Sequence, residues 1–139
     1  MSVLLIIVIA AVVIFIVYVA YNYRKMKNMQ EVKTSKKIRI LDKKNFGSQI
    51  RRGTIIVDFW ASWCAPCKMM TPVLNDIAEK EGDKVRVGKV NVEHNQYLAK
   101  KFKIKKIPAL IILQDGKEVG RVTGFKTKKA LMKEINKVI

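Results

Sequence analysis

The sequence of 139 residues predicts an α/β domain with a mixed central sheet and helices on both faces, preceded by one transmembrane helix. Apolar runs rich in β-branched residues alternate with stretches of helical spacing along most of the chain. The dipeptide Asp115-Gly116 joins the last two apolar runs as a hairpin. No charged side chain precedes residue 24. We therefore expect an anchor over residues 1–23, a linker over 24–37 and a folded domain over 38–139.

Residues 3–21 are uncharged, and tyrosine is their only polar residue type. As a helix rising about 1.5 Å per residue, they are long enough to cross the ~30 Å core of a bilayer. Tyr18, Tyr21 and Tyr23 lie at the C-terminal end, where aromatic rings prefer the interface. A cleaved signal peptide would have a basic flank, a shorter run and a small-residue cleavage site, and a core helix would have a polar face. The sequence predicts an uncleaved anchor that contacts membrane lipid through residues 3–21.

The rest of the chain is strongly basic, with 28 Lys and Arg against 11 Asp and Glu and a formal net charge of +17. Such a charge favours a nucleic acid or an anionic membrane surface as a neighbour. The lysines are spread along the domain without interleaved aromatic residues, and no nucleic-acid-binding motif is present. We expect anionic lipid and no nucleic acid, although a general bias toward lysine explains the charge equally well.

The domain begins with a short strand over residues 38–41. Asp42 is placed to cap a helix that passes Phe46 and Ile50 and ends at Gly53.

Residues 55–60 form a continuous apolar run, which is typical of a strand buried on both faces. The cysteine-bearing helix follows, and Pro72 inside it predicts a bend. Three phenylalanines, Phe59, Phe102 and Phe125, are interpreted as core. The remaining elements are a strand over 85–92, a helix over 96–102, strands over 109–113 and 118–123, and an amphipathic helix over 127–138.

Cys64 and Cys67, the only cysteines, stand between the 55–60 strand and the helix that follows it. The N–H groups and dipole of a helix N-terminus favour a thiolate at the first sulfur, and the second sulfur is close enough to close a disulfide. A closed zinc site needs four ligands, whereas the chain has two cysteines and one histidine, His94. A purely structural disulfide across so short a loop would constrain the unfolded chain very little. The pair predicts thiol–disulfide exchange without a metal.

The residues around the cysteines resemble the thioredoxins. The stretch Val-Asp-Phe-Trp-Ala-Ser-Trp-Cys-Ala-Pro-Cys-Lys at residues 57–68 is similar to the active-site signature of that family. The resemblance covers the chain from about Ser35 to Ile139 and implies a thioredoxin fold and reduction of protein disulfides. It continues through Pro72, residues 89–92, Ile107-Pro108, Asp115-Gly116 and Gly124.

The resemblance implies a role for each matching residue. Cys64 matches the attacking cysteine and Cys67 the resolving one, while Asp58 matches a buried carboxylate beneath the disulfide and Lys89 the lysine near it. Pro108 matches a cis-proline that faces the disulfide, although a trans turn proline would also fit the sequence. The residues implied to contact substrate are Trp60, Trp63, Ala65, Pro66, Ile107, Pro108 and Gly124.

The residue types around the disulfide support these roles. We expect Cys64 at the helix N-terminus to have a lowered thiol pKa and to be exposed enough to meet a substrate disulfide, and Pro66 suits a first helical turn. Burial of Asp58 would raise its pKa toward the range useful for proton transfer, and a surface position on an edge strand is the alternative. Ala65 and Ala109 replace the family's usual glycine and threonine, so the redox potential is not inferred.

Three functions are compatible with these residues. The first is a membrane-tethered thioredoxin that reduces protein disulfides, is recharged by a thioredoxin reductase-type donor and has no cofactor beyond its own disulfide. The second is an extracytoplasmic thiol reductase for cytochrome or secreted-protein maturation. The third is a membrane-anchored interaction module whose dithiol only assists docking.

The charges beside the anchor favour a cytoplasmic domain. Basic residues crowd its C-terminal flank, whereas only Met1 and Ser2 precede it, and positive charge near a membrane helix is retained inside. Anchored relatives that face outside usually begin with a basic N-terminus, which this chain lacks. On the cytoplasmic side the dithiol would be held reduced. The flanking charges are Arg24, Lys25, Lys27, Lys33, Lys36 and Lys37, offset only by Glu31.

Overall fold

The computed structural model describes residues 2–27 and 32–139. The chain divides into two units, residues 1–31 and residues 32–139, and each is described by itself.

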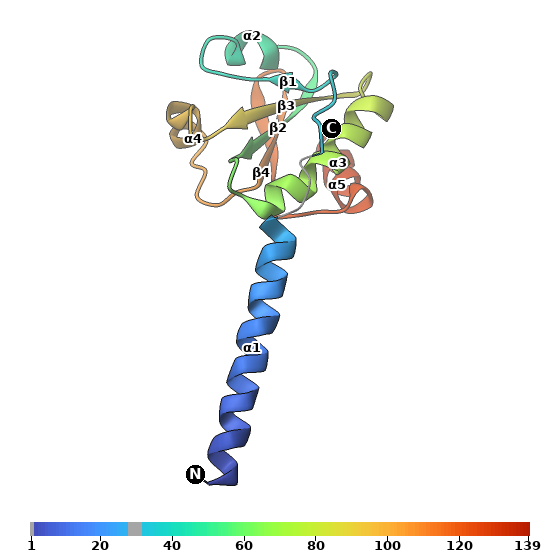
Figure 1. The fold of residues 1–139 in the computed structure, drawn as a ribbon. Coiled ribbons are helices and arrows are strands. Elements are labelled where there is room, and N and C mark those ends of the chain that lie inside the picture. Colours follow the sequence, from blue (N-terminus) through green and yellow to red (C-terminus); the bar gives the residue numbers. More distant parts are fainter. Residues whose placement is uncertain (1, 28–31) are drawn as a thin grey trace. The chain divides into compact units, whose positions relative to one another are not determined.

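In the described part of the first unit, the backbone forms the helix α1 (Val3–Lys27; Figure 1). Its apolar side chains are exposed. By length and composition, the span Val3–Lys25 is sufficient to cross a membrane. The helix continues into the segment expected to be the basic linker, of which residues 28–31 lie outside the described residues.

The second unit contains a mixed five-stranded sheet in the order β1-β3-β2-β4-β5. The first three strands in this order are parallel, whereas β4 is antiparallel to β2 and β5 is antiparallel to β4. The predicted mixed sheet is therefore confirmed. The strands are β1 (Arg39–Ile40), β2 (Thr54–Trp60), β3 (Val85–Asn91), β4 (Ala109–Gln114) and β5 (Lys117–Thr123).

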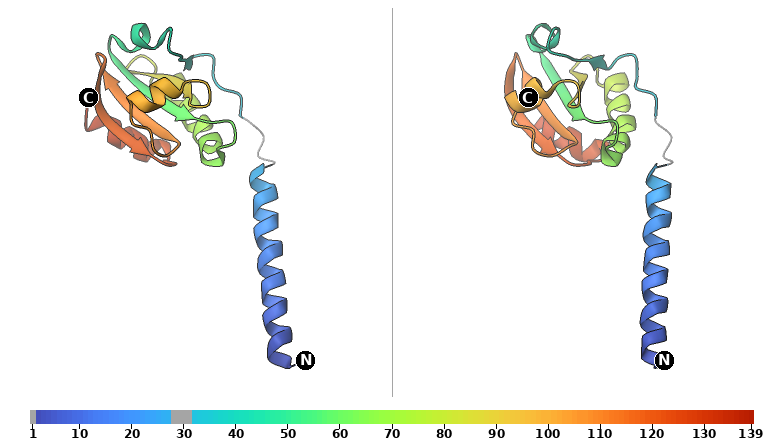
Figure 2. Two further views of the ribbon diagram at one scale, coloured as in Figure 1. Left: turned by 90° about the vertical axis from the view of Figure 1, so that its left-hand side faces the viewer. Right: turned by 60° about the vertical axis from the view of Figure 1, so that its left-hand side comes forward.

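Helices cover both faces of this sheet (Figures 1 and 2). The helices α3 (Ala65–Lys80) and α5 (Lys128–Asn136) share one hydrophobic cluster with one face. The shorter helices α2 (Phe46–Ile50) and α4 (Gln96–Lys101) share a second cluster with the other face. This arrangement confirms the expected fold class.

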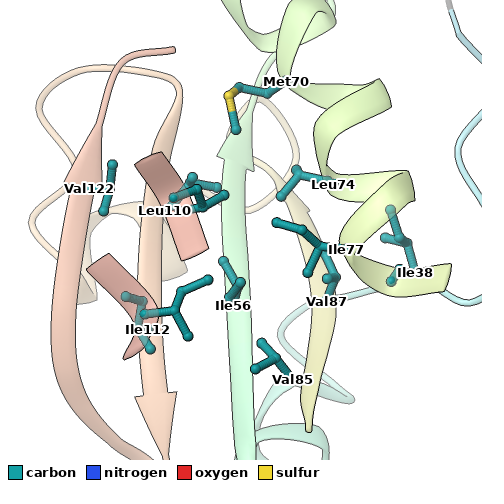
Figure 3. Packing of buried hydrophobic residues seen from close by; sticks show 13 residues of the cluster. Ile38, Ile56, Met70, Leu74, Ile77, Val85, Val87, Leu110, Ile112 and Val122 are labelled. Atoms are coloured by element: carbon teal, nitrogen blue, oxygen red, sulfur yellow. The ribbon is translucent and has the colours of Figure 1, made fainter. Parts of the chain in front are cut away.

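The alternation of side chains along β2 assigns its residues to the two clusters. Ile56 packs with Met70 and Leu74 of α3, as Figure 3 shows, whereas Ile55 and Val57 belong to the cluster on the opposite face. Because successive side chains of a strand point to opposite faces, residue 58 is directed to the same side as Ile56. Asp58 therefore lies on the face of the sheet that α3 covers.

Two local predictions are wrong. The Asp42 carboxylate accepts hydrogen bonds from the backbone N–H groups of Lys44 and Asn45, so it closes a turn instead of capping α2, which begins at Phe46. Phe125 is 41% exposed and does not belong to the core, because it lies in the segment between β5 and α5.

Candidate active site

The two cysteines lie where β2 leads into α3. Cys64 is the N-cap residue of α3 and is joined to Cys67 by a disulfide, with their Cα atoms 5.3 Å apart. The backbone N–H of Cys67 donates a hydrogen bond to Cys64 Sγ at 3.2 Å. Pro66 occupies the first turn, where a missing N–H leaves no helical hydrogen bond unmade. The helix N-terminus therefore surrounds the first sulfur with groups that stabilise negative charge.

The disulfide is covered more completely than the sequence suggests. Cys64 is 4% exposed and Cys67 is 1% exposed. The cluster that contains them and Ala61 is packed by partly buried Trp60, Val92 and Ile107. The expectation of an exposed Cys64 is thus not met in the disulfide form, although Cys67 is the more deeply buried of the pair. Trp63, directly before Cys64, is 70% exposed.

Asp58 is fully buried in the centre of β2, opposite Lys89 of β3 and Leu110 of β4. Its Oδ2 atom lies 3.7 Å from Lys89 Nζ, which makes an ion pair but is too long for a hydrogen bond. Neither carboxylate oxygen has a hydrogen-bond partner within the part of the chain that the structure describes. Burial raises the pKa of Asp58 from 3.8 to about 7, against the opposing attraction of Lys89.

Lys89 links this carboxylate to the helix that carries the cysteines. Its ammonium group donates a hydrogen bond to Thr71 Oγ1 at 3.1 Å and lies 4.9 Å from the centre of the Trp60 ring. The Thr71 hydroxyl in turn donates to the backbone carbonyl of Cys67 at 3.5 Å. Sequence reasoning did not select Thr71. Its position four residues after Cys67, on the buried side of α3, is the signal that would have found it.

A loop from the far side of the sheet faces the disulfide. The Ile107–Pro108 peptide bond is cis, and Ile107 packs against the cysteine cluster. The Pro108 carbonyl accepts a hydrogen bond from the N–H of Gly124 at 2.9 Å. Gly124 has a φ of +77°, a backbone conformation that glycine adopts without strain. These contacts join residues 107, 108 and 124, and Ile107 lies against the cysteine cluster.

A second pair of residues fixes the loop that precedes the cysteines. The backbone N–H and the hydroxyl of Ser62 both donate hydrogen bonds to Glu93 Oε2, at 3.0 and 2.8 Å. These hydrogen bonds from Ser62 lower the pKa of Glu93. The sequence gives no signal for this contact, because the two residues are 31 positions apart.

The described residues contain no group of three or more His, Cys, Asp or Glu that would hold a metal ion. A disulfide at a helix N-terminus, with a buried carboxylate on the strand beneath that helix, defines a dithiol redox domain. Such a site exchanges two electrons with another disulfide through thiolate attack.

Comparison with known proteins agrees with this class. The family model "Thioredoxin" matches residues 37–137. Thioredoxin of Bacillus subtilis is 42% identical over 93 residues, which cover 67% of this chain and 89% of the relative. Thioredoxin of Chlamydia caviae is 43% identical over 99 residues, which cover 71% and 96%. The chain belongs to the thioredoxin family and is a protein thiol–disulfide oxidoreductase.

A relative of different organisation also matches the domain. The bifunctional thioredoxin reductase/thioredoxin of Mycobacterium leprae is 41% identical over 85 residues, which cover 61% of this chain and 19% of the relative.

Proposed function

We propose that this protein is a membrane-tethered thioredoxin that reduces protein disulfides on the cytoplasmic side of the membrane. The Cys64–Cys67 disulfide at the N-terminus of α3 is the observation that carries the redox part of the proposal. The length and apolar composition of α1 support the tether.

In the proposed reaction, the Cys64 thiolate attacks one sulfur of a substrate disulfide and releases the other sulfur as a thiolate. Asp58 in its ionised form accepts the proton of the Cys67 thiol. Lys89, which pairs with Asp58 and donates to Thr71, and Thr71, which donates to the Cys67 carbonyl, connect the carboxylate to this cysteine. The Cys67 thiolate then attacks Cys64 Sγ and frees the first substrate sulfur. The substrate gains two electrons and leaves as two thiolates. One thiolate takes the Cys67 proton from Asp58, and the other takes from water the proton that Cys64 lost on ionisation, so the substrate becomes a dithiol while the protein becomes the disulfide.

We assign substrate contact to the surface around the disulfide. Trp63 and Pro66 are exposed beside Cys64, and Ile107 packs against the cysteine cluster from the facing loop. An extended substrate segment would pair with the backbone of that loop. The residues proposed to line this surface are Trp60, Trp63, Ala65, Pro66, Ile107, Pro108 and Gly124.

Turnover requires an electron donor that returns the disulfide to the dithiol. A protein of the thioredoxin reductase type is the proposed donor. The Mycobacterium leprae relative, which is named as both a thioredoxin reductase and a thioredoxin, supports this assignment. The recharging step is the same exchange in reverse: a donor dithiol attacks the Cys64–Cys67 disulfide and is itself oxidised.

The cytoplasmic orientation is supported by the charges that flank the anchor. Arg24, Lys25 and Lys27 closely follow the apolar residues 3–21. Positive charge close to a membrane helix is retained on the cytoplasmic side. An extracytoplasmic thiol reductase has the opposite orientation, and a non-catalytic interaction module has the same tether without the turnover.

Two measurements on the full-length protein test the proposal. We expect washed membranes to contain the protein and to reduce insulin in the presence of NADPH and a thioredoxin reductase. Protease added to intact protoplasts should leave residues 38–139 undigested, and lysis should expose them. Digestion in intact protoplasts would favour the extracytoplasmic reductase. Binding of partners without insulin reduction would favour the interaction module.

A further inference from the structure

Residues 33–38, here called the juxtamembrane strap, run alongside the helix that carries the cysteines (Figure 2). Asn75 of α3 holds the strap by both ends of its amide. Its Nδ2 atom donates to the Lys33 carbonyl at 2.9 Å, and its Oδ1 atom accepts from the Ser35 N–H at 2.8 Å. One side chain thus binds both a backbone acceptor and a backbone donor of the strap. Two such hydrogen bonds fix the position of the strap along α3.

Glu79, one turn further along α3, makes the second attachment. Its carboxylate accepts a hydrogen bond from the Ser35 hydroxyl and pairs with Lys37 Nζ at 3.2 Å. The Lys37 ammonium also donates to the Glu79 carbonyl at 3.3 Å. Hydrogen bonds from Ser35 and then Lys37 lower the pKa of Glu79, so the carboxylate is charged at neutral pH. The strap ends at Ile38, which is 5% exposed and belongs to the core cluster beside α3.

These attachments reduce the number of residues between the end of α1 and the first residue that is attached to the domain. The last residue of α1 is Lys27, and the first attached residue is Lys33. The six residues from one to the other span at most about 20 Å, however they run. If the strap were released, the first fixed residue would be Ile38, and the same limit would rise to about 38 Å. The contacts of Asn75 and Glu79 therefore halve the reach of the tether.

The strap is attached to the same rigid helix that presents the disulfide. Asn75 lies eleven residues after Cys64, which corresponds to about 16 Å along a helix axis. The maximum length of chain from Lys27 to Lys33, the side-chain contact and the helix together limit Cys64 to on the order of 45 Å from the end of α1. A disulfide outside this layer is beyond the reach of the tethered site. A disulfide inside this layer, on a molecule in the same membrane, meets the redox site at a raised effective concentration.

We propose that the juxtamembrane strap confines the dithiol to a layer at the membrane surface, and that its substrates are disulfides of membrane-bound proteins within that layer. This inference rests on the proposed function, because it assumes that α1 spans the membrane and that the dithiol reduces substrates. Asn75 and Glu79 act as positioning residues, since they set where the site operates without touching the reacting sulfurs.

The test uses the full-length protein in lipid vesicles. The protein is reduced with dithiothreitol, freed of reductant, and mixed in single turnover with lipid-anchored peptides that each carry one intramolecular disulfide. Helical spacers of graded length, at about 1.5 Å per residue, hold the disulfide at different heights above the membrane. The variants are the Asn75→Ala/Glu79→Ala pair and, as a matched control, Asp76→Asn. Asp76 pairs with Lys80 and Lys128 and makes no described contact with the strap.

For the wild-type protein and the control variant, we expect the reduction rate to fall at least about fivefold once the spacer exceeds the reach of the tether. In the double variant the fall should occur about 18 Å further out, which equals about twelve helical residues. Rates on soluble insulin should be equal for all three proteins. A wild-type rate that does not depend on spacer length, or an unchanged limit in the double variant, would overturn the inference.

The insulin rate separates the possible failures. If the wild-type protein fails to insert into vesicles or to reduce insulin, the proposed function is wrong, and this failure is distinct from a failure of the inference about the strap. If only the double variant loses insulin reduction, its fold is damaged, and the attachments are removed from the strap side with Ser35→Pro/Lys37→Ala. This pair lacks the Ser35 N–H, the Ser35 hydroxyl and the Lys37 ammonium, and leaves only the exposed hydrogen bond from Asn75 to the Lys33 carbonyl. An unchanged spacer limit in this second variant, in which one exposed hydrogen bond remains, would also overturn the inference.

Discussion

Replacing Cys64 with serine is expected to abolish disulfide reduction, whereas Cys67→Ser should retain the first attack and accumulate mixed disulfides with substrates. The reason is the asymmetric placement of the pair on α3. Cys64 is the N-cap residue and receives the hydrogen bond from the Cys67 N–H, while Cys67 is the more buried sulfur within the helix. A thiolate at the helix N-terminus is the better nucleophile, and the buried sulfur is placed to resolve the intermediate.

The measurement is insulin reduction together with non-reducing gels of protein isolated from cells after acid quenching. Cys64→Ser should lose at least about a thousandfold of its rate, because no sulfur remains to form the mixed disulfide. Cys67→Ser should show adducts that disappear on reduction with dithiothreitol. Adducts on Cys64→Ser, with none on Cys67→Ser, would reverse the two roles.

Replacing Asp58 with asparagine is expected to stabilise the protein at alkaline pH. Burial raises the pKa of this carboxyl from 3.8 to about 7 in the folded protein. The stability that the protonated group contributes is fully present below about pH 4 and is lost as the pH rises through about 7. The loss corresponds to about 4 kcal/mol, because the pKa of about 7 already includes the attraction of Lys89.

Urea unfolding measures whether the substitution raises or lowers the free energy of unfolding. The asparagine variant should exceed wild type in free energy of unfolding by about 2 to 4 kcal/mol at pH 8, and the two should agree near pH 4. A difference that does not change between these pH values would show that Asp58 does not titrate near neutrality in the folded state.

The same substitution is expected to slow turnover at neutral pH at least about tenfold, since an amide does not accept the Cys67 proton. The wild-type rate should rise with pH through about 7, which is the pKa of the buried carboxyl. The variant should lack that inflection. Equal rates for both proteins from about pH 6 to pH 9 would remove Asp58 from the mechanism.

Much of the fold follows from local pattern. The continuous apolar run in β2 predicts a central strand because a strand buried on both faces has no polar side, and its residues are buried as expected. The hairpin between β4 and β5 follows from Asp115-Gly116, where both residues have positive φ. The predicted helix cap at Asp42 was wrong because an aspartate side chain can either cap a helix or close a turn. Only the path of the backbone decides between the two.

The site was predictable where a residue carries chemistry of its own. Cys64, Cys67 and Asp58 stand out because a thiol pair and a lone carboxylate are unusual beside a buried strand. Thr71 did not stand out, because its role is to accept a hydrogen bond from Lys89, which is 18 residues away in sequence. The attachment of Lys33 to Asn75, across 42 residues, is likewise a contact that only the folded chain creates.

The most direct test of the proposed function is thiol labelling in intact cells. The chain has two cysteines, and both form the redox pair, so a maleimide of large mass reports the redox state as a shift of zero or two labels. The reagent chosen does not cross membranes, and it is applied to intact protoplasts and to lysed ones. Membrane and soluble fractions are then separated and compared.

A membrane-tethered reductase with a cytoplasmic dithiol predicts a protein found in the membrane fraction, unlabelled in intact protoplasts and doubly labelled after lysis. Oxidised Cys64–Cys67 should appear when the reductase that recharges it is removed. Double labelling of intact protoplasts would contradict the cytoplasmic orientation. A protein found in the soluble fraction would contradict the tether.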